Sequence, residues 1–346
     1  CYNKTMNQEY IERLKKIEAE LNRWLPETAV NWSGTDSPQF SKLEKVFPGL
    51  GKELDSLPLE PIFAPLTDIL SRGGKRWRPL LMTLVCETLG GGDAALPLTP
   101  LVEFSHNASL IHDDIEDDSD ERRGKPAVHH LYGMDTAINS GSFFYFLSLC
   151  CIDSYYGDDK DKIYKLWGDH MRKLHMGQSM DIHWHRDISI VPSIEDYYTM
   201  CGMKTGCLAS LAAELGAFTA GAQDSMQKFG KAAMKLGIGF QILDDVKNLA
   251  NKIPGKKHGD DIVEGKKSLP VLLYLNKYPK KRELIFFYFY EAKEKGYNAP
   301  EVQDLINILT ETGVLDEAEE KAQSLIKEAR EVLDTPLLNG LIDLIS

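Results

Sequence analysis

The sequence predicts an all-α protein with a single large helical domain. Three observations support this prediction. Apolar residues recur at helical spacing through most of the chain after residue 60, and no stretch shows sustained alternation of apolar and polar residues. Glycine and proline breaks separate these segments, and no linker rich in Pro, Gly or Ser divides the 346 residues into two domains.

The composition is that of an ordinary globular protein, with 43% hydrophobic and 27% charged residues. The formal net charge of −12 argues against a nucleic-acid partner, which would need a basic surface. The most apolar run, Phe143 to Ile152, is about half of the ~20 residues that a membrane-spanning helix needs. The six cysteines show neither CxxC spacing nor a paired framework, which is typical of reduced thiols in a cytoplasmic protein.

The N-terminal region is expected to form a helical arm. Residues 7–25 predict an amphipathic helix that Pro26 ends, and we assign residues 1–57 to this arm and residues 58–346 to the main domain. The arm carries no recognisable chemistry, so it is expected to pack against the protein or to form part of a subunit interface. Helix breaks are expected at Gly73-Gly74, Gly90–Gly92, Gly124–Pro126, Gly157–Asp159, Val191-Pro192 and Ile253–Gly255.

The first chemically informative stretch is Gly73–Pro79, GGKRWRP. Pro79 suits the first turn of a helix, so Lys75, Arg76 and Arg78 would cluster near a helix N-terminus. Backbone N–H groups and the helix dipole favour an anion there. A solvated basic loop is the alternative.

The segment from His112 to Arg123, HDDIEDDSDERR, follows an apolar helical pattern. If the helix continues, Asp113 and Asp117 stand one turn apart on the same face. Hard ions such as Mg²⁺ favour carboxylate oxygens, and the guanidinium groups of Arg122 and Arg123 suit phosphate oxygens. The segment therefore indicates a magnesium-bridged phosphate substrate, with a solvated acidic run as the alternative.

Other polar residues occur in helical surroundings. His106 lies seven residues before Asp113 on a similar face, which suits either ligand binding or a core histidine. The histidines of residues 175–185 lack HExxH or cysteine partners, so no zinc site is expected. Lys204, followed by Thr205, lies in an apolar run and needs a partner, which an anionic substrate could provide.

A second acidic pair, Asp244-Asp245, also follows an apolar helix, with Asn248 one turn after Asp244. Lys256 and Lys266 add cations downstream. Two Asp-rich helices with basic groups nearby can share several Mg²⁺ ions around one diphosphate. That arrangement suits the ionisation of a diphosphate leaving group.

Six motifs in order, GGKRWRP, LIHDDIEDDSDERRGKP, GQSMDI, MKTG, FQILDDVKN and GDDIVEGKKSLP, resemble those of trans-isoprenyl diphosphate synthases of the polyprenyl synthetase family. They run from about Gly73 to Pro270, and the stretch from His106 to Asp117 looks closest to geranylgeranyl diphosphate synthases. The resemblance implies an all-α fold with a central substrate cavity, a Mg²⁺ requirement and usually a homodimer. It also implies a reaction that joins an allylic diphosphate head to tail to isopentenyl diphosphate.

The resemblance implies a role for each matching residue. Asp113, Asp117 and Asp244 would bind Mg²⁺, and Lys75, Arg78, His106 and Arg123 would hold isopentenyl diphosphate. Arg122, Lys204, Lys256 and Lys266 would hold the allylic diphosphate, and Lys204, Thr205 and Gln241 would lie beside the forming allylic cation. Asn248 departs from the family pattern, where many members have an aspartate, which puts only that metal contact in doubt.

The product length depends on residues before the first acidic motif, where bulky side chains stop chain growth in the family. Ala108 and Ser109 are small, and Phe143, Phe144 or Tyr145 could form the next barrier, which suggests geranylgeranyl diphosphate. A longer polyprenyl or a farnesyl diphosphate synthase is the alternative. A class I terpene cyclase is a rival interpretation, disfavoured because it needs no second diphosphate site such as Lys75, Arg78, His106 and Arg123 would form. A non-catalytic partner subunit is another, disfavoured by the two intact acidic motifs.

Overall fold

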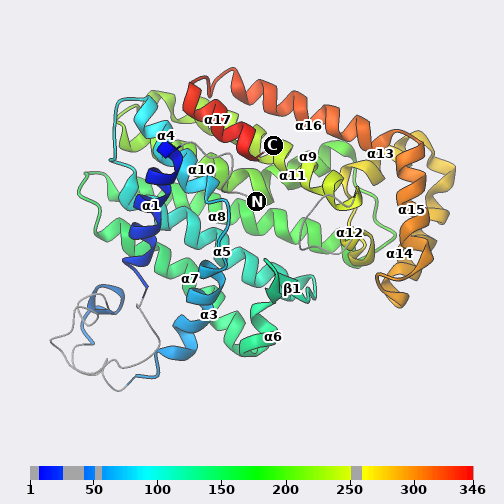
Figure 1. The fold of residues 1–346 in the computed structure, drawn as a ribbon, viewed down its shortest axis with the longest axis horizontal. Coiled ribbons are helices and arrows are strands. Elements are labelled where there is room, and N and C mark those ends of the chain that lie inside the picture. Colours follow the sequence, from blue (N-terminus) through cyan, green and yellow to red (C-terminus); the bar gives the residue numbers. More distant parts are fainter. Residues whose placement is uncertain (1–7, 26–42, 51–56, 251–258, 346) are drawn as a thin grey trace. The chain divides into compact units, whose positions relative to one another are not determined.

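The computed structural model describes residues 8–25, 43–50, 57–250 and 259–345. The all-α prediction is confirmed, because helices make up nearly all regular structure in these ranges and the strands are two residues long (Figure 1). Among the described residues, no helix is both long and apolar enough to cross a membrane. The division into an arm of residues 1–57 and a domain of residues 58–346 stays a prediction.

The chain forms two compact units. The first contains residues 1–167 and 212–226. Its elements are α1 (Gln8–Asn22), α3 (Glu60–Ser71), α4 (Trp77–Thr88), η3 (Leu96–Leu98), α5 (Thr99–Glu116), β1 (Glu121–Arg122), β2 (Lys125–Pro126), α6 (Val128–Tyr132), α7 (Met134–Asp153) and η5 (Gln223–Ser225).

The second unit contains residues 168–211 and 227–346. Helices α8 (Lys160–Arg186) and α10 (Cys207–Thr219) each contribute several residues to both units. The other elements of the second unit are α9 (Ile194–Cys201), the π-helical turn η4 (Gly202–Gly206), α11 (Met226–Leu249), α12 (Asp260–Glu264), α13 (Leu269–Lys277), η6 (Pro279–Lys281), α14 (Arg282–Lys295), α15 (Pro300–Glu311), α16 (Val314–Arg330) and α17 (Pro336–Ile345).

Helices α5 and α7 form the centre of the first unit and pack against each other along their lengths. Gly141 of α7 faces His112 of α5, and a Cβ on Gly141 would lie 2.7 Å from the His112 ring. Seven residues further along α7, Ser148 Oγ lies 3.4 Å from Ser105 Oγ, seven residues back along α5. The two helices therefore run antiparallel, and glycine permits their close approach near the acidic motif.

Predicted helix ends agree well with the structure. The first helix spans residues 8–22, inside the predicted 7–25, and the breaks expected at five of the six positions separate helices. The sixth, Ile253–Gly255, lies outside the described residues. The break at Val191-Pro192 is followed by a capping box at the start of α9, where the Asp196 backbone N–H donates to Ser193 Oγ at 3.0 Å.

Candidate diphosphate and metal sites

The first acidic motif lies at the C-terminal end of α5. The last helical residue is Glu116, and the Asp117 N–H still donates to the carbonyl of Asp113 at 2.9 Å. Asp113 and Asp117 therefore stand one turn apart, as expected. Asp118 then adopts a left-handed conformation with φ of 53°, and the chain turns into the β1–β2 hairpin that carries Arg122.

Arg122 lies against the acidic motif. Its Nε donates to Asp114 Oδ1 at 2.7 Å, and its Nη2 is 3.5 Å from Asp113 Oδ2. Burial raises the pKa of Asp114 to about 6. The charge of Asp113 also raises this pKa, whereas Arg122 lowers it. Burial acts to lower the pKa of Arg122, but Asp114 and Asp113 outweigh it and raise that pKa. Arg122 thus neutralises part of the acidic motif.

The donor set fits Mg²⁺ bound together with a substrate. In the described part of the chain, no three His, Cys, Asp or Glu residues form a ready-made metal cage. Mg²⁺ is usually bound by one or two carboxylates, with water and substrate phosphates completing the octahedron. Asp113 and Asp117 on one helical face match that pattern. Asp114 Oδ2 is buried and accepts no hydrogen bond from the described residues.

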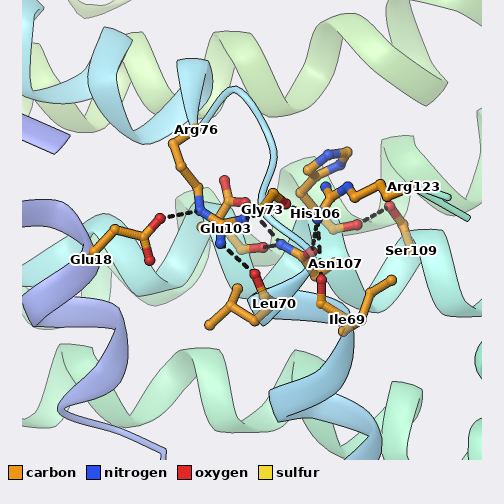
Figure 2. A network of polar contacts seen from close by, with 10 residues as sticks. All are labelled: Glu18, Ile69, Leu70, Gly73, Arg76, Glu103, His106, Asn107, Ser109 and Arg123. Atoms are coloured by element: carbon orange, nitrogen blue, oxygen red, sulfur yellow. Dashed lines mark hydrogen bonds and ion pairs between the residues drawn. The ribbon is translucent and has the colours of Figure 1, made fainter. Parts of the chain in front are cut away.

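The basic motif runs from the loop between α3 and α4 into the first turn of α4. Gly73 and Gly74 have φ of 80° and 140°, and glycine adopts both without strain. Trp77 begins α4, so Pro79 lies in the first turn as predicted. Arg123, which directly follows β1, also contacts this region. Its Nη1 donates to the carbonyl of Gly73 and, at 3.2 Å, to the carbonyl of Ile69 (Figure 2).

Positive charge accumulates around His106 of α5. Burial lowers the pKa of His106 well below its usual value. The positive charge of four nearby arginines lowers it further: Arg78, Arg123, Arg122 and Arg76. Burial also lowers the pKa of Arg123 to about 10; Glu103 opposes this effect, and neighbouring arginines add to it. These groups form an electropositive site that favours an anion.

In the second unit, Lys204 and Thr205 lie in the π-helical turn Gly202–Gly206. A Cβ on Gly177 of α8 would lie 2.4 Å from the Lys204 backbone nitrogen, so only glycine permits α8 to approach this turn. Lys204 Nζ donates to Asp181 Oδ2 of α8 at 2.7 Å. The expected partner of Lys204 was an anionic substrate; the structure adds an acidic side chain that the sequence analysis missed.

Asp181 also interacts with Lys266. Burial acts to raise the Asp181 pKa, but the charges of Lys204 and Lys266 outweigh burial and lower it. Two cations expected to bind the allylic diphosphate are therefore close to the same carboxylate. Lys256, the third expected cation in this part of the chain, lies outside the described residues.

A chain of hydrogen bonds fixes Thr205 and Gln241. Thr205 Oγ1 donates to Gln241 Oε1 at 2.8 Å, and Gln241 Nε2 donates to Asp245 Oδ1 at 2.9 Å. The second oxygen of Asp245 accepts from the Tyr197 hydroxyl at 2.7 Å. Burial raises the pKa of Asp245, and its two donors oppose that shift. Asp245 therefore orients the Gln241 amide, so that its oxygen faces Thr205.

The second acidic motif has the predicted helical geometry. Asp244 and Asn248 both lie within α11, one turn apart. Asn248 is 3% exposed, and its Oδ1 accepts from the Asp261 N–H at the start of α12 at 3.4 Å. This contact gives Asn248 a structural partner at the position where the motif departs from the family pattern.

The residues that sequence reasoning missed are the ones that hold the expected residues in position. Asp181 had a usable signal, since it belongs to the GQSMDI motif and follows Gly177 by one turn. The structure shows why that glycine matters, because it lies against the Lys204 backbone. Tyr197 gave no such signal, because Asp245 is 48 positions away. Glu103 and Asn107 lie one turn apart, but their arginine partners, Arg76 and Arg123, are distant in sequence.

Comparison with known proteins gives the same family as the motifs. The family model described as polyprenyl synthetase matches residues 60–308. The geranylfarnesyl diphosphate synthase of Aeropyrum pernix is 33% identical over 297 residues, which cover 80% of this chain and 91% of that protein. The geranylgeranyl diphosphate synthase of Methanosarcina mazei is 32% identical over 281 residues, which cover 80% and 84%.

Solved structures have the same fold. The geranylgeranyl pyrophosphate synthetase of Pyrococcus horikoshii Ot3 superposes with a TM-score of 0.76 at 27% identity, over 96% of this chain and 94% of that one. The polyprenyl synthase of Caulobacter crescentus CB15, complexed with calcium and isoprenyl diphosphate, has a TM-score of 0.76 at 23% identity over 99% and 97% of the two chains. The chain belongs to the polyprenyl synthetase family and is an isoprenyl diphosphate synthase, a prenyltransferase.

Proposed function

We propose that this prenyltransferase joins isopentenyl diphosphate head to tail to an allylic diphosphate with Mg²⁺, and releases mainly geranylgeranyl diphosphate. One observation carries the proposal: α5 bears a carboxylate pair suited to Mg²⁺ at its end and, two turns earlier, a histidine whose pKa is lowered by burial and by four arginines. A metal-binding group and an anion-binding group on one helix are what a diphosphate substrate requires.

The proposal keeps the residue roles that the motifs imply. Isopentenyl diphosphate is held by Lys75, Arg78, His106 and Arg123. The charges of Arg78 and Arg123 both lower the pKa of His106, which supports placing these three residues at one site. The allylic diphosphate is held by Arg122, Lys204, Lys256 and Lys266. Of these, Lys204 and Lys266 both lower the pKa of Asp181. The ligands for Mg²⁺ are Asp113, Asp117 and Asp244.

The reaction begins when the allylic carbon–oxygen bond breaks and diphosphate departs. Bound Mg²⁺ would supply charge neutralisation for that leaving group. Lys204, fixed by Asp181, would stabilise the same departing charge. Thr205 and the oriented amide of Gln241 would present their dipoles to the allylic cation. The double bond of isopentenyl diphosphate attacks that cation to form a carbon–carbon bond, and the resulting cation loses a proton to the released diphosphate. Water must be excluded, since it would capture the cation.

The structure separates the three aromatic residues proposed to limit chain length. Phe143 stacks on Phe47 at 5.7 Å between ring centroids, and Tyr145 stacks on His112 at 5.8 Å. Phe144 is fully buried and packs on Phe104 of α5 at 4.6 Å. Phe104 lies one turn, about 6 Å, before Ala108 on the side away from the acidic motif.

From these contacts we assign the barrier to Phe144 paired with Phe104. Ala108 is small, so its side chain would leave room for a growing chain to pass. Ala108→Phe is therefore expected to shorten the main product by at least one five-carbon unit. An unchanged product spectrum in this variant would show that Ala108 does not line the tail pocket.

We also propose that the protein is a cytoplasmic homodimer. Four large apolar side chains of α6 and α7 are exposed: Leu131 at 48%, Met134 at 47%, Ile138 at 46% and Phe146 at 65%. Ile138 and Phe146 are eight residues apart and share one face of α7, which a second copy of the chain could cover. The five cysteines in the described ranges form no disulfide with one another, which is what we expect in a reducing compartment.

Product analysis tests the proposal. The purified chain is supplied with isopentenyl diphosphate and dimethylallyl, geranyl or farnesyl diphosphate, and the products are identified by mass. The expected result is a twenty-carbon prenyl diphosphate. Release of a hydrocarbon from farnesyl diphosphate alone would identify a cyclase instead, and no turnover by the single chain would favour a partner subunit.

A further inference from the structure

Arg76 is a charged residue in an uncommon conformation. Its backbone is left-handed, with φ of 47°, directly before α4 begins, and the residue is only 5% exposed. Side chains other than glycine rarely adopt this conformation, and it persists where the surroundings fix it. Arg76 has no part in the substrate roles proposed above.

The guanidinium of Arg76 joins three helices to the start of α4 (Figure 2). Its Nε donates to Glu18 of α1 at 2.7 Å, and its Nη1 donates to Glu103 of α5 at 2.8 Å. Its Nη2 donates to the carbonyl of Leu70, in the last turn of α3, at 2.7 Å. The ends of the α3–α4 loop are therefore fixed by one side chain.

The network continues to the other side of the same loop. Asn107 Nδ2 donates to Glu103 Oε1 at 2.9 Å, and Arg123 Nη1 donates to Asn107 Oδ1 at 3.3 Å. Arg123 Nη1 also donates to the carbonyl of Gly73, which accepts a second hydrogen bond from Arg76 Nη1 at 3.4 Å. Hydrogen bonds thus form a closed ring around the loop.

We propose that Arg76, Glu103 and Glu18 are positioning residues for isopentenyl diphosphate, an inference that rests on the function proposed above. The loop that they fix carries Lys75, and Arg78 lies in the first turn of α4 directly after it; both cations are assigned to this substrate. A ligand that meets charges already held in position loses less affinity to ordering. Helix α1 therefore tunes the affinity for one substrate through Glu18, in addition to its packing role.

The variant Arg76→Gly separates the side chain from the backbone, because glycine adopts the left-handed conformation without strain. The KM for isopentenyl diphosphate is expected to rise about tenfold, with the KM for the allylic diphosphate within about twofold of wild type. Glu18→Gln keeps the side-chain shape and removes one charge, so a smaller rise of about threefold is expected for the same substrate.

Arg13→Gln is the matched control. Arg13 also lies on α1 and joins it to α4, through an ion pair with Glu87 at 2.8 Å that does not involve the loop. Both KM values are expected to stay at wild-type levels in this variant. The proposal is overturned if Arg76→Gly leaves the KM for isopentenyl diphosphate unchanged, or if Glu18→Gln and Arg13→Gln raise both KM values alike.

Calorimetric titration of the metal-free proteins with isopentenyl diphosphate keeps this test separate from catalysis. Binding about tenfold weaker in Arg76→Gly than in wild type supports the positioning role. Equal affinity in the two proteins overturns it. A wild-type protein that binds isopentenyl diphosphate and forms no prenyl product overturns the proposed function alone, and a wild-type protein that does not bind it overturns both.

Discussion

The contact between Phe144 and Phe104 leads to a specific prediction about product length. Replacement of Phe144 with leucine removes the aromatic ring that packs on Phe104 at 4.6 Å while keeping a buried apolar side chain. The tail pocket is then expected to extend past the aromatic pair. The main product should shift from twenty carbons towards twenty-five or more.

The stability cost of Phe144→Leu is small enough for the experiment. An aromatic pair contributes about 0.5–1.5 kcal/mol beyond its buried area, and leucine preserves most of the packing. We expect a loss of about 1–2 kcal/mol, against the 3–5 kcal/mol typical of replacing a buried phenylalanine with alanine. The variant should therefore stay folded, which a thermal unfolding curve checks.

The assay is mass analysis of the products formed from farnesyl diphosphate and isopentenyl diphosphate. Phe143→Leu is the control, because the ring of Phe143 packs on the rings of Phe47 and Phe63. A longer product in Phe144→Leu together with an unchanged product in Phe143→Leu supports the assignment. The reasoning is refuted if both variants keep the wild-type product, or if only Phe143→Leu lengthens it.

Three further predictions concern single residues. Asp113→Ala should abolish turnover at saturating Mg²⁺ without changing the circular dichroism spectrum, and retained activity would contradict the metal assignment. Asp181→Asn removes the charge that holds Lys204 at 2.7 Å, so kcat should fall about 100-fold, and an unchanged kcat would show that Lys204 needs no such partner. Burial lowers the pKa of Lys267 to about 8, so above pH 7 the folded state binds fewer protons than the unfolded state. The free energy of unfolding should therefore rise by about 1 kcal/mol between pH 7 and 9. Lys267→Met should lack that rise in chemical unfolding experiments, and an equal rise in both proteins would contradict the pKa assignment.

Local features of the fold could be predicted from the sequence because they depend on neighbouring residues. The turn at Gly73-Gly74 needs positive φ, and the early proline of α4 fixes a helix start. The spacing of Asp113 and Asp117 determines their common face once the preceding helix is recognised. These elements follow from propensity and periodicity alone.

Contacts between distant residues could not be predicted in this way. Glu18 and Arg76 are 58 positions apart, and Tyr197 and Asp245 are 48 positions apart. Such pairs form because burial of a charge or hydroxyl demands a partner, but the sequence does not say which residue provides it. The same reason explains why Phe144 could not be told from Phe143 and Tyr145, since helical periodicity does not identify the ring that packs on Phe104.

The central claim is that the chain joins isopentenyl diphosphate to an allylic diphosphate. Its most direct test is incorporation of labelled isopentenyl diphosphate by the purified wild-type chain, with farnesyl diphosphate as the acceptor and with or without Mg²⁺. The account predicts a labelled twenty-carbon prenyl diphosphate that forms only when the metal is present. Equal incorporation without a divalent metal, or none of the label in any prenyl product, would contradict it.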